Sequence, residues 1–249
     1  MKMNDIIAHH AKNGRIGLQF SGGKDSLAML YLLEKHWPDL TVYWVNAGDP
    51  FPETLEVVER VRAMVPHFVE IDGGQRESIV QFGIPTDLLP VSSTPIGLHA
   101  TGRGTLMQDR YSCCVRSIML PLANRMSQDG ITLIVRGQKN VDTHKGPLRS
   151  GDTDGGIQYL FPLENWTTEQ VFEFLEDRGV ELPLFYSTMK GAPDCMTCSA
   201  WWEEGRAQYL STHHPEQYVI YQQRLDVIRE AVHEHIAAFN VEVKSDGPA

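Results

Sequence analysis

The chain has 249 residues, enough for one large domain or for one domain with a smaller appendage. Its formal net charge of −10 disfavours a nucleic-acid binder, which normally carries a basic surface, although a local basic groove is not excluded by this total. No segment reaches the ~20 continuous apolar residues of a membrane span and no secretory signal opens the chain, so we expect a cytoplasmic protein without membrane partners.

Strands and helices alternate over the first seventy residues. Ile16–Phe20 is predicted to be a strand, residues 24–36 a helix and residues 41–46 a second strand. Pro52 is placed where a first helical turn tolerates proline, and the helix it opens is followed by a strand at 68–71. This alternation predicts an α/β fold with a mostly parallel central sheet of about five strands flanked by helices.

The remainder of the chain mixes polar loops with helices. Residues 83–112 are rich in Gly, Pro, Ser and Thr and are predicted to be a loop or an irregular insertion. A helix is expected from Cys114 to Ser127, a buried strand at 131–136 and a second polar loop at 144–156. These segments leave no clean linker between domains.

The C-terminal part is predicted to be helical. Thr167 to Gln170 form a capping box that opens a helix, and Gly179 closes it. Residues 204–239 are expected to be mainly helical, with fraying at 243–249. Four histidines in this tail lack companion cysteines and are predicted to be exposed surface residues; they are His213, His214, His233 and His235.

A short polar run, S-G-G-K-D-S, stands between the first strand and the first helix. The N-terminus of a helix offers free N–H groups and a positive dipole end, which favour an anion. Two glycines allow close backbone approach, while the serines add hydroxyl donors and the lysine adds a charge. The Walker A pattern is absent, and a tight turn with a favourable cap is the plain alternative. The predicted phosphate-binding residues are Ser21, Gly22, Gly23, Lys24, Asp25 and Ser26.

Four cysteines form two pairs, Cys113-Cys114 and Cys195-x-x-Cys198. In a reducing compartment they are expected to bind metal or to act in catalysis rather than to form disulfides, and neighbouring cysteines seldom bond to each other. The C-x-x-C spacing suits zinc, but the adjacent pair suits zinc less well. Iron–sulfur clusters take four thiolates with varied spacing. Zinc, a cluster and four unrelated buried thiols therefore stay open at this point.

The polar run resembles the PP-loop of the adenine-nucleotide α-hydrolase superfamily, which includes ATP pyrophosphatases, sulfur-transfer enzymes and phosphoadenylyl-sulfate (PAPS) reductases. The segment N-A-G-D-P-F-P-E-T, residues 46–54, is similar to the family's D-T-G-x-x-F-P-E-T, with Asn46 in place of the usual Asp. The resemblance implies a nucleotide beside the end of this strand. Asn46, Gly48 and Asp49 would then contact it.

The cysteine pattern resembles that of the [4Fe-4S] adenylyl-sulfate (APS) reductases and their cluster-bearing PAPS relatives. Three further segments are similar to family motifs: C-C-V-R-S-I-M-L-P-L, I-V-R-G-Q-K-N-V-D-T and F-P-L-E-N-W-T-T-E-Q-V-F-E-F-L. The resemblance implies that the second segment brings Arg136, Gly137 and Lys139 to the nucleotide. It also implies a [4Fe-4S] cluster held by Cys113, Cys114, Cys195 and Cys198.

Two departures from the family favour ATP chemistry. The reductases use a cysteine in a C-terminal E-C-G-[IL]-H motif as the sulfur nucleophile, and no cysteine follows Cys198 here. The phosphate loop has the full form associated with ATP users. We therefore expect cleavage of ATP between its α and β phosphates, adenylation of an acceptor and displacement by sulfur or nitrogen. A sulfonucleotide reductase that uses an external thiol and a nucleotide sensor without turnover are the alternatives.

The resemblance assigns residues 1–200 to a PP-loop nucleotide-binding domain with an iron–sulfur site, and residues 201–249 to a helical extension packed on it. The expected ligands are an adenine nucleotide (ATP, or else PAPS or APS), the cluster and Mg²⁺ positioned by Asp25 and Asp49. Expected partners are an acceptor substrate, a reductant or sulfur donor and a second copy of the chain. The predicted catalytic residues are Lys24, Asp25, Arg136 and Lys139.

Overall fold

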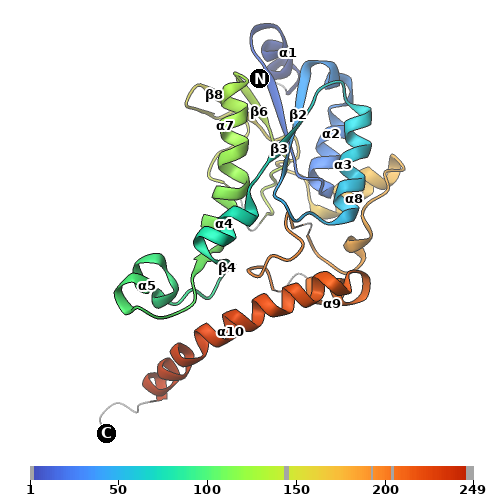
Figure 1. The fold of residues 1–249 in the computed structure, drawn as a ribbon. Coiled ribbons are helices and arrows are strands. Elements are labelled where there is room, and N and C mark those ends of the chain that lie inside the picture. Colours follow the sequence, from blue (N-terminus) through green and yellow to red (C-terminus); the bar gives the residue numbers. More distant parts are fainter. Residues whose placement is uncertain (1–2, 143–145, 192, 203–204, 245–249) are drawn as a thin grey trace.

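A six-stranded sheet forms the centre of the protein in the computed structural model, which describes residues 3–142, 146–191, 193–202 and 205–244 (Figure 1). The strand order is β3-β2-β1-β6-β8-β7, and all neighbours are parallel except β7 and β8. The strands of this sheet are β1 (Ile16–Phe20), β2 (Leu40–Asn46), β3 (Phe68–Asp72), β6 (Leu133–Val135), β7 (Thr153–Asp154) and β8 (Ile157–Leu160). The predicted mostly parallel α/β fold is confirmed.

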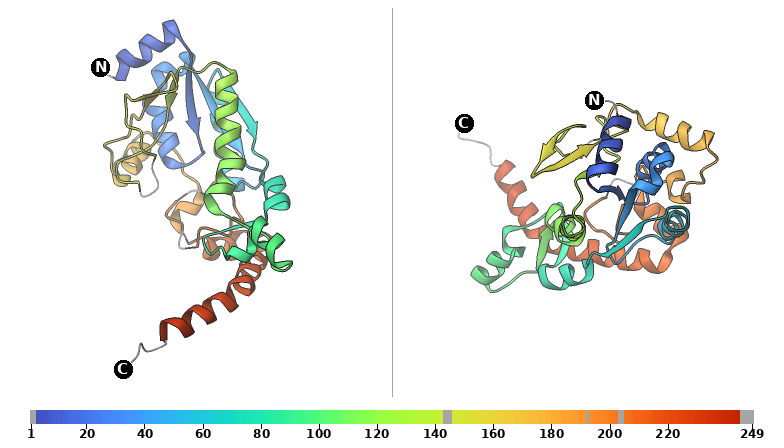
Figure 2. Two further views of the ribbon diagram at one scale, coloured as in Figure 1. Left: turned by 90° about the vertical axis from the view of Figure 1, so that its left-hand side faces the viewer. Right: turned by 90° about the horizontal axis from the view of Figure 1, so that it is seen from above.

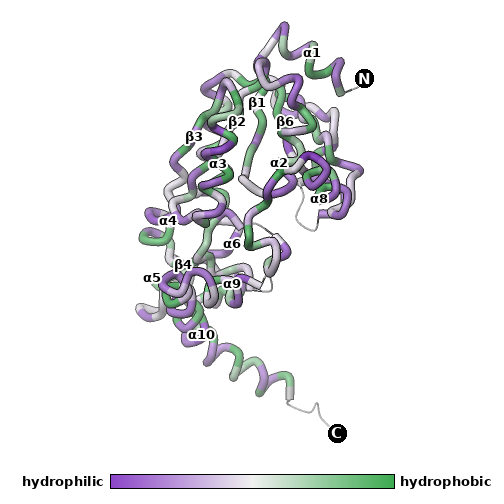
Figure 3. Tube along the Cα trace, turned by 90° about the vertical axis from the view of Figure 1, so that its right-hand side faces the viewer, coloured by the Kyte–Doolittle hydropathy of each residue, from purple (hydrophilic) through white to green (hydrophobic). Residues whose placement is uncertain are grey.

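Helices cover both faces of the sheet, as Figure 2 shows from above. Successive side chains of a strand point to opposite faces, so β2 sends Val42 and Trp44 to one side and Tyr43 and Val45 to the other. The first side packs against α1 (Met3–Asn13), α2 (Lys24–Leu32), α3 (Pro52–Met64) and α8 (Thr168–Asp177). The second packs against α7 (Leu120–Gln128). Hydrophobic segments accordingly follow the central strands in Figure 3.

Several predicted boundaries shift. The first predicted helix ends at Leu32 rather than residue 36, and a 3₁₀ turn at Glu34–Asp39, which contains Pro38, follows it. The predicted helix from Cys114 begins earlier, because the side chain of Asp109 accepts a hydrogen bond from Ser112 N and caps α6 (Arg110–Cys114). A π-turn at Val115–Met119 joins α6 to α7. The sixth strand arises because the predicted loop at 144–156 contains β7.

The prediction of a loop or irregular insertion at 83–112 is wrong, because the segment contains regular strands and helices. This segment contains β4 (Ile84–Thr86), a 3₁₀ turn at Val91–Ser93, α5 (Pro95–Thr101), β5 (Met107–Asp109) and the start of α6, and α4 (Gln75–Phe82) precedes it. β4 and β5 pair in parallel across some twenty residues, and the buried Gln108 donates to the Gly83 carbonyl at 2.6 Å. Composition cannot reveal such a pairing, because its partners are distant in sequence.

The C-terminal segment is helical as predicted. A capping box between Thr167 and Gln170 opens α8, a 3₁₀ turn follows at Leu184–Ser187, and α9 (Arg206–His213) leads into α10 (Pro215–Lys244). The start of α10 lies below the sheet's C-terminal edge and the helix then projects away from the body (Figure 1). Val243 and Lys244, which were predicted to fray, form the end of α10. Residues 245–249 of that segment, residue 204 of the predicted helical tail and residues 144–145 of the second polar loop lie outside the described residues. No helix in the described ranges is both long and apolar enough to span a membrane.

Candidate functional site

The predicted phosphate loop lies at the C-terminal end of β1, against two other segments. Gly22 has φ +80°, and a Cβ there would stand 2.7 Å from Cγ2 of Thr54 in α3. A Cβ on Gly137 would stand 3.1 Å from the Asp25 carbonyl oxygen, so the chain after β6 packs closely on the first turn of α2. Gly22 and Gly137 are therefore required for backbone packing around the loop.

Hydrogen bonds within the loop fix the buried Ser26 hydroxyl. The Ser26 hydroxyl donates to the Gly23 carbonyl at 2.9 Å, and Ser21 N donates to the Ser26 hydroxyl at 3.3 Å. The backbone N–H of Lys24 donates to the Tyr186 hydroxyl at 2.7 Å. The phenol oxygen of Tyr186 thus occupies the position in which a bound anion would accept a hydrogen bond from the N-terminus of α2. Sequence reasoning missed Tyr186, which lies 162 residues from Lys24 and is marked by no motif.

Two buried lysines share one carboxylate beside the loop. The Lys24 ammonium lies 2.8 Å from Asp25 Oδ2, and the Lys139 ammonium lies 2.5 Å from Asp25 Oδ1. Lys139 is 1% exposed and also contacts Asp142 at 3.0 Å. Burial alone would lower the pKa of Lys139, but the two carboxylates outweigh it and the pKa is raised. Three predicted catalytic residues, Lys24, Asp25 and Lys139, are thus brought together. Sequence reasoning missed Asp142.

The fourth predicted catalytic residue, Arg136, lies apart from this network. Its side chain is exposed, and partial desolvation lowers its pKa while Asp142 and Asp194 oppose the shift. Asp194 is also exposed. Loss of hydration to the surrounding protein nevertheless raises the pKa of its carboxyl, and the charge of Arg136 acts in the opposite direction. Asp194 stands directly before Cys195, so Arg136 is within electrostatic reach of both the lysine network, through Asp142, and the cysteine segment, through Asp194.

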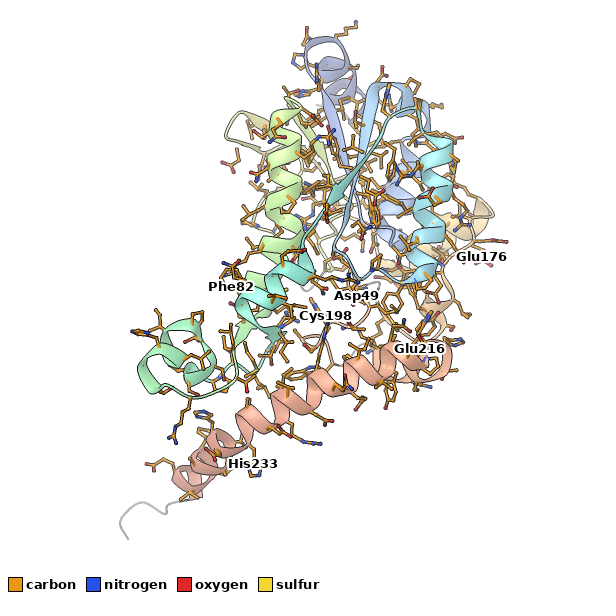
Figure 4. All side chains as sticks on the ribbon, in the orientation of Figure 1. Asp49, Phe82, Glu176, Cys198, Glu216 and His233 are labelled. Carbon is orange, nitrogen blue, oxygen red and sulfur yellow. The ribbon has the colours of Figure 1, made fainter. Side chains whose placement is uncertain are left out.

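The segment after β2 binds the segment that carries the C-x-x-C pair. Asn46 Oδ1 accepts from Gly48 N at 3.0 Å and shapes the turn, in which Gly48 has φ +102°. The Asp49 carbonyl accepts from Met196 N at 2.6 Å. Asp49 Oδ2 accepts from Thr197 N at 2.8 Å and from the Thr197 hydroxyl. Figure 4 shows Asp49 and Cys198 near each other between the sheet and the C-terminal helices.

All four cysteines are free, and cysteines of each segment help to raise the pKa of thiols in the other. Burial, followed by the charges of Cys198 and Cys113, raises the pKa of the Cys114 thiol to about 12. Burial, followed by Asp194 and Cys198, raises the pKa of Cys195 as well. The described residues contain no group of three or more His, Cys, Asp or Glu arranged around one metal ion. The two cysteine pairs thus lie close enough to affect each other's pKa, but the described residues form no single-ion site.

Arginines hold the cysteine segments from three elements. Arg110 of α6 stacks on Trp201, with 3.9 Å from Cζ to the ring centroid. Arg206 of α9 donates from Nη1 to the Cys198 carbonyl, and Arg224 of α10 donates to the Thr197 carbonyl at 2.7 Å. No motif in the sequence marks the last two residues.

One prediction about the histidines is wrong. His214 is only 16% exposed on its side chain, and its Nε2 lies 2.9 Å from Glu53 Oε1 in the first turn of α3. Tyr209 donates its hydroxyl to the same oxygen. This contact holds the α9–α10 junction against α3, which is why His214 is not free. The other three histidines are exposed as predicted.

Residues 15–93 match the family model described as the phosphoadenosine phosphosulfate reductase domain. The resemblance to the PAPS reductase family is thereby confirmed. The matched residues run from β1 through the first turn after β4 and include the phosphate loop and the Asp49 segment, whereas the four cysteines lie beyond them. No curated protein matches the chain.

The solved structures that match the chain include the following two. The crystal structure of PAPS reductase from Candida auris in a phosphate complex has a TM-score of 0.52 and 16% identity, covering 78% of this chain and 96% of the reductase. The U34-tRNA thiolase NcsA from Methanococcus maripaludis with its [4Fe-4S] cluster has a TM-score of 0.44 and 15% identity, covering 87% of this chain and 72% of the thiolase. The first likeness supports a shared fold with the PAPS reductase, and the second supports nothing further.

Proposed function

We propose that this chain is a PP-loop enzyme that binds an adenine nucleotide and a [4Fe-4S] cluster, and that it uses ATP to adenylate an acceptor or to transfer sulfur to it. The observation that carries the proposal is the bonding of the Asp49 segment to Met196 and Thr197. It joins the family's nucleotide segment to the C-x-x-C segment at the C-terminal edge of the sheet, where ligands of open α/β sheets bind.

The phosphate loop supplies the binding groups for the nucleotide. The backbone N–H of Lys24 would exchange the Tyr186 hydroxyl for a phosphate oxygen. Lys24 and Lys139 would place two positive charges beside the phosphates, where they stabilise charge that develops on the leaving pyrophosphate. Both oxygens of Asp25 accept from these lysines, so Asp25 organises them. Asp49 is then the better-placed carboxylate for the Mg²⁺ that accompanies ATP.

The donor set of the cysteine region fits an iron–sulfur cluster. Four free thiols come from two segments, and a buried guanidinium, Arg206, has unmatched N–H donors beside Cys198. A cluster of four irons is wider than one ion, so its ligands need not converge on a point. Cys113, Cys114, Cys195 and Cys198 would hold the cluster. When bound, it would supply a redox centre or an iron able to carry sulfur.

A second candidate is a PAPS or APS reductase that takes its nucleophilic thiol from a reductant or partner. The match to the PAPS reductase domain favours it. The chain has only four cysteines, and the proposed cluster uses all of them, so the attacking sulfur would have to be external. A nucleotide sensor without turnover is the third candidate.

Anaerobic purification with iron and sulfide analysis, followed by incubation with nucleotides, tests the proposal. We expect iron and sulfide in the protein and conversion of ATP to AMP and pyrophosphate. Lys139→Met should lower this turnover by about 10²-fold, because it removes a charge beside the leaving group. The exposed Lys35→Met is the matched control and should leave turnover unchanged.

The other outcomes separate the candidates. Sulfite release from PAPS or APS with an added thiol, without AMP formation from ATP, would establish the reductase in place of the ATP enzyme. Nucleotide binding without any turnover would establish the sensor. Protein that contains neither iron nor sulfide after anaerobic purification would overturn the cluster.

A further inference from the structure

Arg206 is a fully buried cation beside the cysteine region. It is the first residue of α9, its exposed fraction is 0%, and it is among the largest fully buried side chains of the described residues. Gly205 before it has φ +74°, and a Cβ there would lie 2.5 Å from the Thr188 carbonyl oxygen. The entry to α9 is therefore fixed against a neighbouring segment, and the Arg206 side chain is directed inward.

The guanidinium of Arg206 is only partly satisfied. Its Nη1 donates to the Cys198 carbonyl, whereas Nε and Nη2 are buried without a hydrogen-bond partner in the described part of the chain. The Tyr221 ring lies 6.0 Å from its Cζ, and no ion pair with a described carboxylate is formed. A buried charge with unmet donors is unfavourable unless an anion lies beside it. The two unmatched donors therefore favour a hydrogen-bond acceptor beside the guanidinium, and an anion above all.

Two neighbouring arginines have more side-chain partners than Arg206. Arg110 pairs with Asp87 at 3.3 Å and stacks on Trp201. Arg116 donates to Gln108 at 2.8 Å and stacks on Phe82. Both cations have a side-chain partner outside the cysteine segments, Asp87 or Gln108, although Arg110 Nε is also buried without a hydrogen-bond partner among the described residues. Arg206 instead contacts a cysteine carbonyl and has two buried donors without a partner among the described residues.

We propose that Arg206 is the buried counter-charge of the four-cysteine site. As a positioning residue it holds the Cys198 carbonyl and donates hydrogen bonds to the anionic cluster. It thereby slows the loss of the cluster and raises its reduction potential. The inference rests on the proposed function, since it needs a cluster on these cysteines. A cluster held by four thiolates carries net negative charge, and hydrogen bonds and charge near its sulfurs set its potential. Residues that support metal ligands affect retention similarly.

The experiment compares anaerobically purified wild-type protein with Arg206→Met, Arg206→Lys and Arg224→Met. Arg224 is the matched control, because it also donates to a carbonyl of this segment, that of Thr197. Iron loss to a chelator and the midpoint potential of the cluster are measured, together with thermal unfolding of the metal-free proteins. We expect Arg206→Met to lose iron about 10-fold faster or more and to have a more negative midpoint potential. Arg206→Lys should stay close to wild type, as should Arg224→Met.

Each remaining outcome decides the matter. Equal iron loss and potential in Arg206→Met and Arg224→Met, with a cluster in both, would overturn the role of Arg206 and leave the proposed function standing. Wild-type protein without iron would overturn both, which is a different result. If Arg206→Met does not fold, Arg206→Lys decides the question. A folded lysine variant that retains iron supports the counter-charge. A lysine variant that loses iron quickly, although its metal-free form has the same thermal unfolding as the wild type, contradicts it.

Discussion

Glu53 shows how one residue links the nucleotide motif to the C-terminal helices. Its Oε1 accepts from the Tyr209 hydroxyl and lies 2.9 Å from His214 Nε2. Burial alone would raise the pKa of Glu53, but hydrogen bonds from Tyr209 and His214 outweigh it and hold the pKa below its ordinary value. A lowered folded-state pKa means that the carboxylate stabilises the fold above the unfolded pKa, and that this contribution is lost as the pH falls through the folded pKa.

Glu53→Gln should therefore destabilise the protein most at neutral pH. The expected loss is about 1 to 3 kcal/mol in the free energy of unfolding, the usual range for a hydrogen bond to a charged group. The difference from wild type should shrink below about pH 4.5 and vanish below the folded pKa. Urea unfolding at several pH values measures it, with the exposed Glu56→Gln on the same helix as control. A difference that stayed constant from neutral to acidic pH would contradict the charged role of Glu53.

At the scale of elements, the phosphate loop depends on its contact with α3. Gly22→Ala places a methyl group 2.7 Å from Thr54 Cγ2 and imposes φ +80° on an L-residue. We expect a loss of about 1 to 3 kcal/mol in the free energy of unfolding. Gly48→Ala is the matched control, since its φ of +102° brings backbone strain but a Cβ there has nothing within 4 Å. The double variant Gly22→Ala, Thr54→Ser lacks Cγ2 at residue 54 and should regain the part of the unfolding free energy that the steric clash removes. If the double variant is no more stable than Gly22→Ala, the clash is not the cause of the loss.

Local patterns explain which elements sequence analysis could predict. β1, the glycine-rich turn and α2 are contiguous, so their hydrophobic periodicity and turn residues lie within one short stretch. The capping box at Thr167 is equally local. The pairing of β4 with β5 and the burial of Gln108 depend on segments that meet only after folding. The composition of residues 83–112 therefore indicated a loop where short strands and helices exist.

The same distinction applies to the site. The cysteine spacing and the phosphate loop could be recognised, because each is a motif of residue types at fixed intervals. Tyr186 at the helix N-terminus and Arg206 beside Cys198 could not, since tertiary packing alone brings them there. His214 was predicted to be exposed for a related reason: its partner Glu53 is 161 residues away. Roles for all these residues stay predictions until they are tested.

At the scale of the whole molecule, the body and the C-terminal helices meet at the strands' C-terminal edge. An aromatic cluster that includes Phe51, Phe185, Tyr209 and Tyr221 packs α9 and α10 beneath α3. A smaller cluster of Met107, Ile228 and Val232 joins β5 to the middle of α10. The nucleotide segment and the cysteine segment therefore lie within one packed region and not on two independent bodies.

Nucleotide binding should consequently change the amide hydrogen exchange of the cysteine segment. Met196 N and Thr197 N donate to Asp49, so ordering of the Asp49 segment by ATP should slow amide hydrogen exchange at both positions by several-fold. Thr197→Val keeps the shape of the side chain but removes the hydroxyl bond to Asp49, and it should reduce this protection while leaving ATP affinity within about 3-fold of wild type. Mass spectrometry of exchanged peptides measures the effect, with α1 (Met3–Asn13), at the opposite end of the sheet, as internal control. Equal protection of α1 and of the cysteine segment from exchange would indicate that the ligand stabilises the whole protein. Unchanged exchange at Met196 and Thr197 with ATP bound would show that the Asp49 segment and the cysteine segment are uncoupled.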